Sequence, residues 1–189
     1  NRNSYKRGVT GAVRGVDFIA SLPQWNGKTI GVTGSSQGGF LSLAVAALDK
    51  RITFLAPVHD AMCDYEAEIH GDGQSWRHHN SGHRSHHYFY KENQAQGAAW
   101  KEQKLTELEK MRLEGARYYD GANFARRITC PGWYSFGYND EVVPPTSSYG
   151  LYNSVKAPKT LSLYQMTGHF WYQEQWDEWQ AWIVQQLTK

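Results

Sequence analysis

The fold of this chain is decided near its start, by the stretch Thr29-Ile30-Gly31-Val32-Thr33-Gly34-Ser35-Ser36-Gln37-Gly38-Gly39. It begins with β-forming residues and ends in a Gly-x-Ser-x-Gly motif, and the Ala- and Leu-rich residues 40–48 after it predict a buried helix. Strand, sharp turn and helix is the context in which this motif forms a nucleophile elbow. We expect Gly34 and Gly38 to leave room where a Cβ would clash. Ser36 Oγ should then stand exposed above the helix N-terminus, where free N–H groups favour negative charge.

Composition limits the class of protein. The chain has 189 residues, enough for one domain with a sizeable core, and its 20 Lys and Arg nearly balance its 18 Asp and Glu. This balance gives no electrostatic reason to expect nucleic acid or an anionic membrane as a partner. No apolar run is long enough to span a membrane, so none is expected to. The two cysteines, Cys63 and Cys130, fit no ligand or disulfide pattern and are predicted to be buried free thiols.

Helical and strand patterns alternate along most of the chain. Alternation of this kind predicts the α/β class, with a parallel sheet covered by helices on both faces. Proline at the start of a helix fits its first turn, and Pro144-Pro145 is assigned that place. The other expected helices span about 9–22, 40–48, 98–115 and 176–187, and the expected strands span 29–33, 51–57, 131–137 and 159–166.

The regular pattern breaks at residues 58–125, which we interpret as a cap or lid inserted over the strand ends. The middle of this segment is polar and holds five histidines. Spacings of four residues between histidines suit a zinc site on a helix, but Asn80, Ser81 and Gly82 argue against a helix there. A polar cap with one or two pocket-lining histidines is therefore favoured over a metal site; the histidines are His78, His79, His83, His86 and His87.

Asp140 and His169 each follow an expected strand, in the loop at its carboxyl end. In a parallel sheet those ends meet at one edge, which is also the edge where Ser36 lies and where open α/β sheets bind ligands. The chain order Ser, Asp, His is the order of α/β-hydrolases and differs from those of chymotrypsin and subtilisin. The alternative is that Asp140 caps a turn and His169 is a surface loop residue. Their joint placement favours a catalytic triad.

A family resemblance rests on several of these segments. It is carried by residues 34–39, by Tyr138-Asn139-Asp140 with the following segment through Asn153, by Gly168-His169, and by residues 118–131 before the Asp140 strand. Together they resemble the acetyl xylan esterase/cephalosporin C deacetylase family of carbohydrate esterases, over most of the chain. The resemblance implies an α/β-hydrolase fold and a serine esterase without metal or cofactor. Its implied substrates are acetyl groups on xylo-oligosaccharides or similar small esters.

The resemblance also assigns roles by position. It makes Ser36 the nucleophile, Asp140 the acidic member and His169 the base, and Gln37, which follows the nucleophile, supplies one oxyanion N–H. Phe170 stands where the family usually has Glu.

The resemblance further implies a larger sheet than this chain supplies. Residues 1–189 are therefore interpreted as the C-terminal part of one α/β-hydrolase domain. We expect the missing N-terminal half or a companion chain to complete it, with a homo-oligomer as a further expectation. Any signal peptide would precede Asn1, and a periplasmic or extracellular location is favoured over a cytoplasmic one.

Two other functions remain open at this point. A serine peptidase of the prolyl oligopeptidase type has the same fold, elbow and residue order, although Gln37 and the segment from Asp140 to Pro145 favour the esterase. A non-catalytic hydrolase-fold module that binds sugar or a partner is the alternative from another class.

Overall fold

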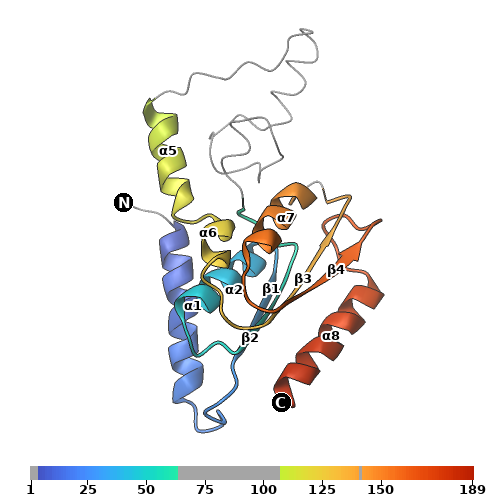
Figure 1. The fold of residues 1–189 in the computed structure, drawn as a ribbon. Coiled ribbons are helices and arrows are strands. Elements are labelled where there is room, and N and C mark those ends of the chain that lie inside the picture. The colour runs from blue at the N-terminus through green and yellow to red at the C-terminus, as the bar shows by residue number, and fades with distance from the viewer. Residues whose placement is uncertain (1–3, 64–106, 141) are drawn as a thin grey trace.

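The computed structural model describes residues 4–63, 107–140 and 142–189, and the fold is drawn in Figure 1. Within these residues, four strands form one sheet in the order β1-β2-β3-β4, and every neighbouring pair is parallel. This confirms the predicted α/β class with a parallel sheet. The strands are β1 (Gly31–Ser35), β2 (Phe54–Val58), β3 (Gly132–Gly137) and β4 (Lys159–Tyr164).

Helices cover both faces of the sheet (Figure 1). The helix after β1 packs directly on β1 and β2, and the N-terminal helix packs on it from outside. The C-terminal helix packs against β2 and β3. The helices are α1 (Ser4–Ser21), α2 (Gln37–Leu48), α5 (Glu107–Arg117), α6 (Gly121–Ala125), α7 (Pro145–Ser154) and α8 (Gln173–Leu187). None of the described helices is both long and apolar enough to cross a membrane.

The two central strands are buried along their whole length, which explains their nearly continuous apolar sequence. Successive side chains of a strand point to opposite faces, so each strand serves two cores. Leu55 and Tyr134 pack in the cluster that α1, α2 and α7 share, whereas Ala56 and Trp133 pack with tryptophans of α8 and of the loop before it. The two cysteines are free and buried, as predicted.

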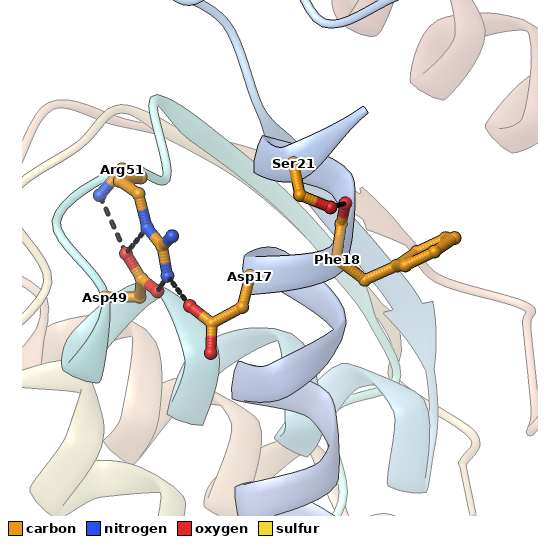
Figure 2. A network of polar contacts seen from close by, with 5 residues as sticks. All are labelled: Asp17, Phe18, Ser21, Asp49 and Arg51. Carbon is orange, nitrogen blue, oxygen red and sulfur yellow. Dashed lines mark hydrogen bonds and ion pairs between the residues drawn. The ribbon is translucent and has the colours of Figure 1, made fainter. Parts of the chain in front are cut away.

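The second strand begins later than expected, at Phe54 rather than Arg51. Figure 2 shows the cause: Arg51 binds acidic groups instead of entering the sheet. The Asp49 carboxylate accepts the backbone N–H of Arg51 at 3.0 Å and its Nε at 2.9 Å, which makes a turn. Arg51 Nη2 also contacts Asp17 of α1 at 2.5 Å, so this turn ties α1 to the end of α2.

Much of the predicted insertion lies outside the described residues, including all five histidines from His78 to His87. Its described ends pack with the rest of the domain. Ala61, Met62 and Cys63 after β2 are buried, and α6 packs against α2 and α7. The interpretation of residues 58–125 as a cap stays a prediction.

Candidate active site

Ser36 occupies a strained turn between β1 and α2. Its φ is 57° and its ψ is −119°, which places a non-glycine residue in the left-handed half of backbone space. Ser36 stands at the N-cap position of α2, yet its hydroxyl caps no backbone N–H. Most serines at such a position use the hydroxyl as a cap. Here the strained turn leaves Oγ for another use, as a nucleophile elbow requires.

The glycines around the turn behave partly as predicted. A Cβ on Gly34 would lie 2.4 Å from the backbone of Gly38, so the turn closes only with glycine at position 34. The same prediction for Gly38 is wrong, because a Cβ there would meet nothing within 4 Å. The crowded neighbour is Gly39, whose Cβ would lie 3.0 Å from the Cα of Asp60.

Asp140 and His169 come from the loops after β3 and β4, as predicted, and these loops approach each other closely. The N–H of Asn139 donates to the carbonyl of Thr167 at 3.1 Å. A Cβ on Gly137 would lie 2.0 Å from the same carbonyl oxygen. Glycine at position 137 therefore lets the two loops, and with them the two side chains, come together.

The two side chains are bonded to each other. Nδ1 of His169 lies 2.8 Å from Oδ2 of Asp140, and the other carboxylate oxygen accepts the N–H groups of Val142 at 2.9 Å and Val143 at 2.8 Å. Burial alone would raise the pKa of this carboxyl group. The contacts from His169, His59 and the Val143 N–H outweigh burial, so the pKa of Asp140 lies well below its ordinary value.

The Asp140 carboxylate is therefore an anion that fixes the imidazole through Nδ1–H. This arrangement leaves Nε2 of His169 to act as a base. The His169 side chain is 24% exposed, whereas that of Asp140 is fully enclosed.

The segment after β2 holds Ser36 from both sides. The N–H of Ser36 donates to the carbonyl of Val58 at 2.9 Å, and the N–H of Ala61 donates to the carbonyl of Ser36 at 3.1 Å. His59, between them, has its ring 5.3 Å from the ring of His169, centroid to centroid. Ser36 thus lies beside the segment that contacts the Asp140–His169 pair.

The expected hydrogen bond from Ser36 to His169 is not formed within the described part of the chain. In free enzymes this bond is often long and tightens only when substrate binds. Gln37 begins α2, so its N–H has no acceptor within the helix and stands beside Ser36.

Sequence reasoning missed two buried polar residues at this edge, His59 and Asp60. Nδ1 of His59 lies 3.2 Å from Oδ2 of Asp140, and its side chain is only 1% exposed. Burial, with the nearby charge of Asp140, raises the pKa of Asp60 to about 7. Both residues directly follow an apolar strand at its carboxyl end. The rule that located Asp140 and His169 would have located them as well.

His59, Asp140 and His169 are also the group of described residues whose ligand atoms could hold a metal, because these atoms lie within 4.8 Å of one another. The observed contacts are those of a hydrogen-bonded pair with a third ring beside it. A metal at this point would take the Oδ2 lone pair that His169 uses.

Comparison with known proteins shows the family to which the chain belongs. A sequence model described as acetyl xylan esterase (AXE1) matches residues 1–186. The chain belongs to the acetyl xylan esterase family. The acetyl esterase Axe7A of Xylanibacter ruminicola is 36% identical over 172 residues, which cover 90% of this chain and 34% of that protein.

Two solved acetyl xylan esterases have a similar structure. The acetyl xylan esterase from Paenibacillus sp. R4 is 27% identical, with a TM-score of 0.72, and the match covers 95% of this chain and 52% of that one. Acetyl xylan esterase 1 from Thermoanaerobacterium sp. JW/SL YS485 shares the fold, with a TM-score of 0.72, 22% identity and coverage of 94% and 52%. The chain thus spans about half the length of these two structures and a third of Axe7A. The α/β-hydrolase fold expected from the sequence is confirmed.

Proposed function

We propose that this chain carries the catalytic residues of a serine esterase that removes acetyl groups from acetylated xylo-oligosaccharides or similar small esters. One observation carries the proposal. The Asp140–His169 pair, joined at 2.8 Å, lies at the same sheet edge as a serine in a left-handed elbow. Membership of the acetyl xylan esterase family supports the acetyl group as the acyl part of the substrate.

The proposed reaction is acyl transfer through Ser36. Nε2 of His169 takes the hydroxyl proton as Oγ attacks the acetyl carbonyl, and Asp140 stabilises the imidazolium through Nδ1–H. The tetrahedral intermediate collapses, and His169 returns the proton to the leaving sugar oxygen. Water, deprotonated by His169, then attacks the acetyl-enzyme, which releases acetate and restores the Ser36 hydroxyl.

The oxyanion needs donors aimed at the position where negative charge develops. The N–H of Gln37 is one candidate, because it lies in the first turn of α2, next to the nucleophile, where the helix dipole also favours negative charge. Donors of this kind are each worth about 10²–10³ in rate.

Hydrolysis of p-nitrophenyl acetate by the Ser36→Ala variant tests the assignment. Activity should fall to the background of the reagent, while the melting temperature stays unchanged because the Ser36 hydroxyl makes no capping bond. Ser42→Ala is a matched control, since Ser42 Oγ donates to the carbonyl of Gly38 within α2, at 2.8 Å. Retained activity in Ser36→Ala would rule out Ser36 as the nucleophile.

Substrate choice separates the esterase from a peptidase of the same fold. We expect release of acetate from acetylated xylo-oligosaccharides and no cleavage of proline-containing or blocked peptides. Peptide cleavage that depends on Ser36 would instead support the prolyl oligopeptidase type, and binding of sugar without turnover would support a non-catalytic module.

The outer edge of β1 is the proposed place of a further strand, from a companion segment or a second copy. Among the described strands β1 pairs only with β2, although its residues are uncharged and open edges of this kind recruit other strands. Size-exclusion chromatography and a thermal melt of residues 1–189 alone test this. We expect an oligomer or a broad transition; a sharp melt from a monodisperse monomer would contradict the proposal.

A further inference from the structure

His59 is the buried residue that the proposed mechanism leaves unused. It follows β2 directly, and its backbone N–H donates to the carbonyl of Ser135 in β3 at 2.9 Å. Its φ is 47°, in the left-handed region that non-glycine residues rarely adopt, and its side chain is 1% exposed. Strained backbone of this kind persists only where its surroundings enforce it, and it gathers at functional sites.

The two ring nitrogens of His59 lack ordinary hydrogen-bond partners among the described residues. Neither ring nitrogen makes a hydrogen bond within the described structure. Nδ1 nevertheless lies 3.2 Å from Oδ2 of Asp140, in contact with the carboxylate but short of hydrogen-bond alignment. Buried polar groups without partners are rare, because each has lost its water. The close carboxylate oxygen is the natural acceptor for this ring.

The carboxylate of Asp140 has one acceptor position left for such a donor. Its Oδ1 already accepts two backbone N–H groups, from Val142 and Val143. Its Oδ2 accepts His169 at 2.8 Å, and a carboxylate oxygen can accept a second donor. Nδ1 of His59 lies 3.2 Å from Oδ2, so His59 is placed to be that second donor.

We propose that His59 is a positioning residue, which donates Nδ1–H to Oδ2 of Asp140 and thereby sets how strongly that carboxylate stabilises protonated His169. The inference rests on the proposed esterase mechanism, in which His169 is the base. A second donor on Oδ2 holds the carboxylate in place and withdraws part of its charge. The imidazolium of His169 is then stabilised less than it would be by a carboxylate without a second donor.

The other groups around His59 fit a ring that donates through Nδ1–H. The ring contacts the ring of His169 and the indole of Trp171, with centroids 5.3 Å and 6.5 Å away. Asp60 is the other acidic group of this segment, and burial raises its pKa to about 7. The carboxylate oxygen beside Nδ1 can accept but not donate a hydrogen bond, so this site favours the tautomer with its proton on Nδ1.

The test compares two substitutions in the full-length protein. His59→Leu removes the donor, so the acid limb of the kcat/KM profile should move to higher pH by about 1 unit, a tenfold change in the protonation constant. His59→Asn places an amide N–H near the position of Nδ1 and should restore most of the shift. Met62→Leu, a fully buried neighbour also at positive φ, should leave the profile unchanged.

NMR titration of the His169 ring provides a readout that does not depend on activity. The ring should titrate at higher pH in His59→Leu than in the unmodified protein, even if the esterase function itself proves wrong. In the unmodified protein, the ¹⁵N shifts of His59 should show the tautomer protonated on Nδ1, a measurement that needs no variant to fold.

Three results would overturn the inference. In the first, the ¹⁵N shifts show the His59 ring protonated on Nε2 alone. In the second, His59→Leu leaves the pH profile of kcat/KM unchanged. In the third, His59→Asn fails to reverse the shift that His59→Leu causes. The last would show that His59 acts through packing alone. If Ser36→Ala loses activity while His59→Leu keeps both its activity and its pH profile, the esterase proposal stands and only the proposed role of His59 is rejected.

Discussion

The two sides of the sheet contribute to the site unequally. On the β3–β4 side, every part is in place: β3 is buried along its length, the loops after β3 and β4 are bonded together, and Asp140 and His169 form a hydrogen-bonded pair. On the β1 side, the strand pairs with β2 alone among the described strands, and all its residues are exposed or half-buried. Ser36, at the end of β1, has its strained elbow but no bond to His169.

The two parts of the site differ in the contacts that hold them in place. The Asp140–His169 pair depends on two neighbouring strands, β3 and β4, and on the loops that follow them. Ser36 depends on the turn between β1 and α2 and on the segment after β2, which bonds its backbone from both sides. We expect substitutions at Ser36, Asp140 and His169 to alter catalysis, and changes along the outer edge of β1 to alter assembly.

The largest effect should come from Asp140→Asn. An amide at this position cannot hold the required imidazole tautomer, and the loss should reach about 10⁴ in kcat, by analogy with serine proteases. The measurement is the rate of p-nitrophenyl acetate hydrolysis. Asp49→Asn is the matched control, because Asp49 is also a buried acid but binds Arg51 far from the site (Figure 2).

The control should lower the melting temperature and leave the rate within about twofold, since surface and structural changes away from a site act on stability rather than chemistry. Equal rate losses in both variants would mean that Asp140 acts only through folding.

A smaller loss is expected when the two loops are pushed apart. In Gly137→Ala, the new methyl group would meet the Thr167 carbonyl oxygen at 2.0 Å, so the loops that carry Asp140 and His169 must separate. A misplacement of about 1 Å costs on the order of 10²-fold in rate. Gly150→Ala in α7, where a Cβ meets nothing within 4 Å, should change the rate little. Steady-state kinetics on both variants decide between these outcomes.

The smallest effect concerns stability and its pH dependence. Because burial raises the pKa of Asp60 to about 7, the folded chain binds this proton at a pH where the unfolded chain has released it. Its contribution to stability is present below about pH 4 and is lost as pH rises through about 7. Asn at position 60 cannot ionise. The free energy of unfolding of Asp60→Asn, relative to that of the unmodified protein, should therefore be higher at pH 8 than at pH 5.

Urea unfolding of both proteins at the two pH values measures this change. The difference should be a few kcal/mol, since each pKa unit corresponds to about 1.4 kcal/mol. A difference that is the same at pH 5 and pH 8 would show that Asp60 is already ionised in the folded state.

The sequence predicted the fold well where patterns are local. The order of strand, elbow and helix around Ser36, proline at the first turn of α7 and the loop positions of Asp140 and His169 are as expected, because each depends on a few adjacent residues. The bounds differ: the strand predicted at 29–33 is Gly31–Ser35, and the helix predicted from residue 40 begins at Gln37. The start of β2 was missed because Asp49 binds Arg51 in a turn, a contact between side chains that no periodicity reveals. The crowding at Gly39 rather than Gly38 depends on Asp60, which lies on another segment.

His59 was missed for a related reason. Its role depends on a carboxylate that follows another strand, far along the chain, and on a backbone angle that periodicity does not predict. The short helix α6 was not separated from the proposed insertion, because five residues are too few to set a helical period.

Covalent labelling tests the central claim, that Ser36 and the Asp140–His169 pair form one catalytic site, most directly. Diethyl p-nitrophenyl phosphate phosphorylates serines whose hydroxyl is activated by a neighbouring base, and mass spectrometry of tryptic peptides locates the label. The account predicts a label on Ser36, formed quickly in the unmodified protein and hardly at all in His169→Ala. A label on another residue, or labelling of Ser36 at the same rate in both proteins, would contradict it.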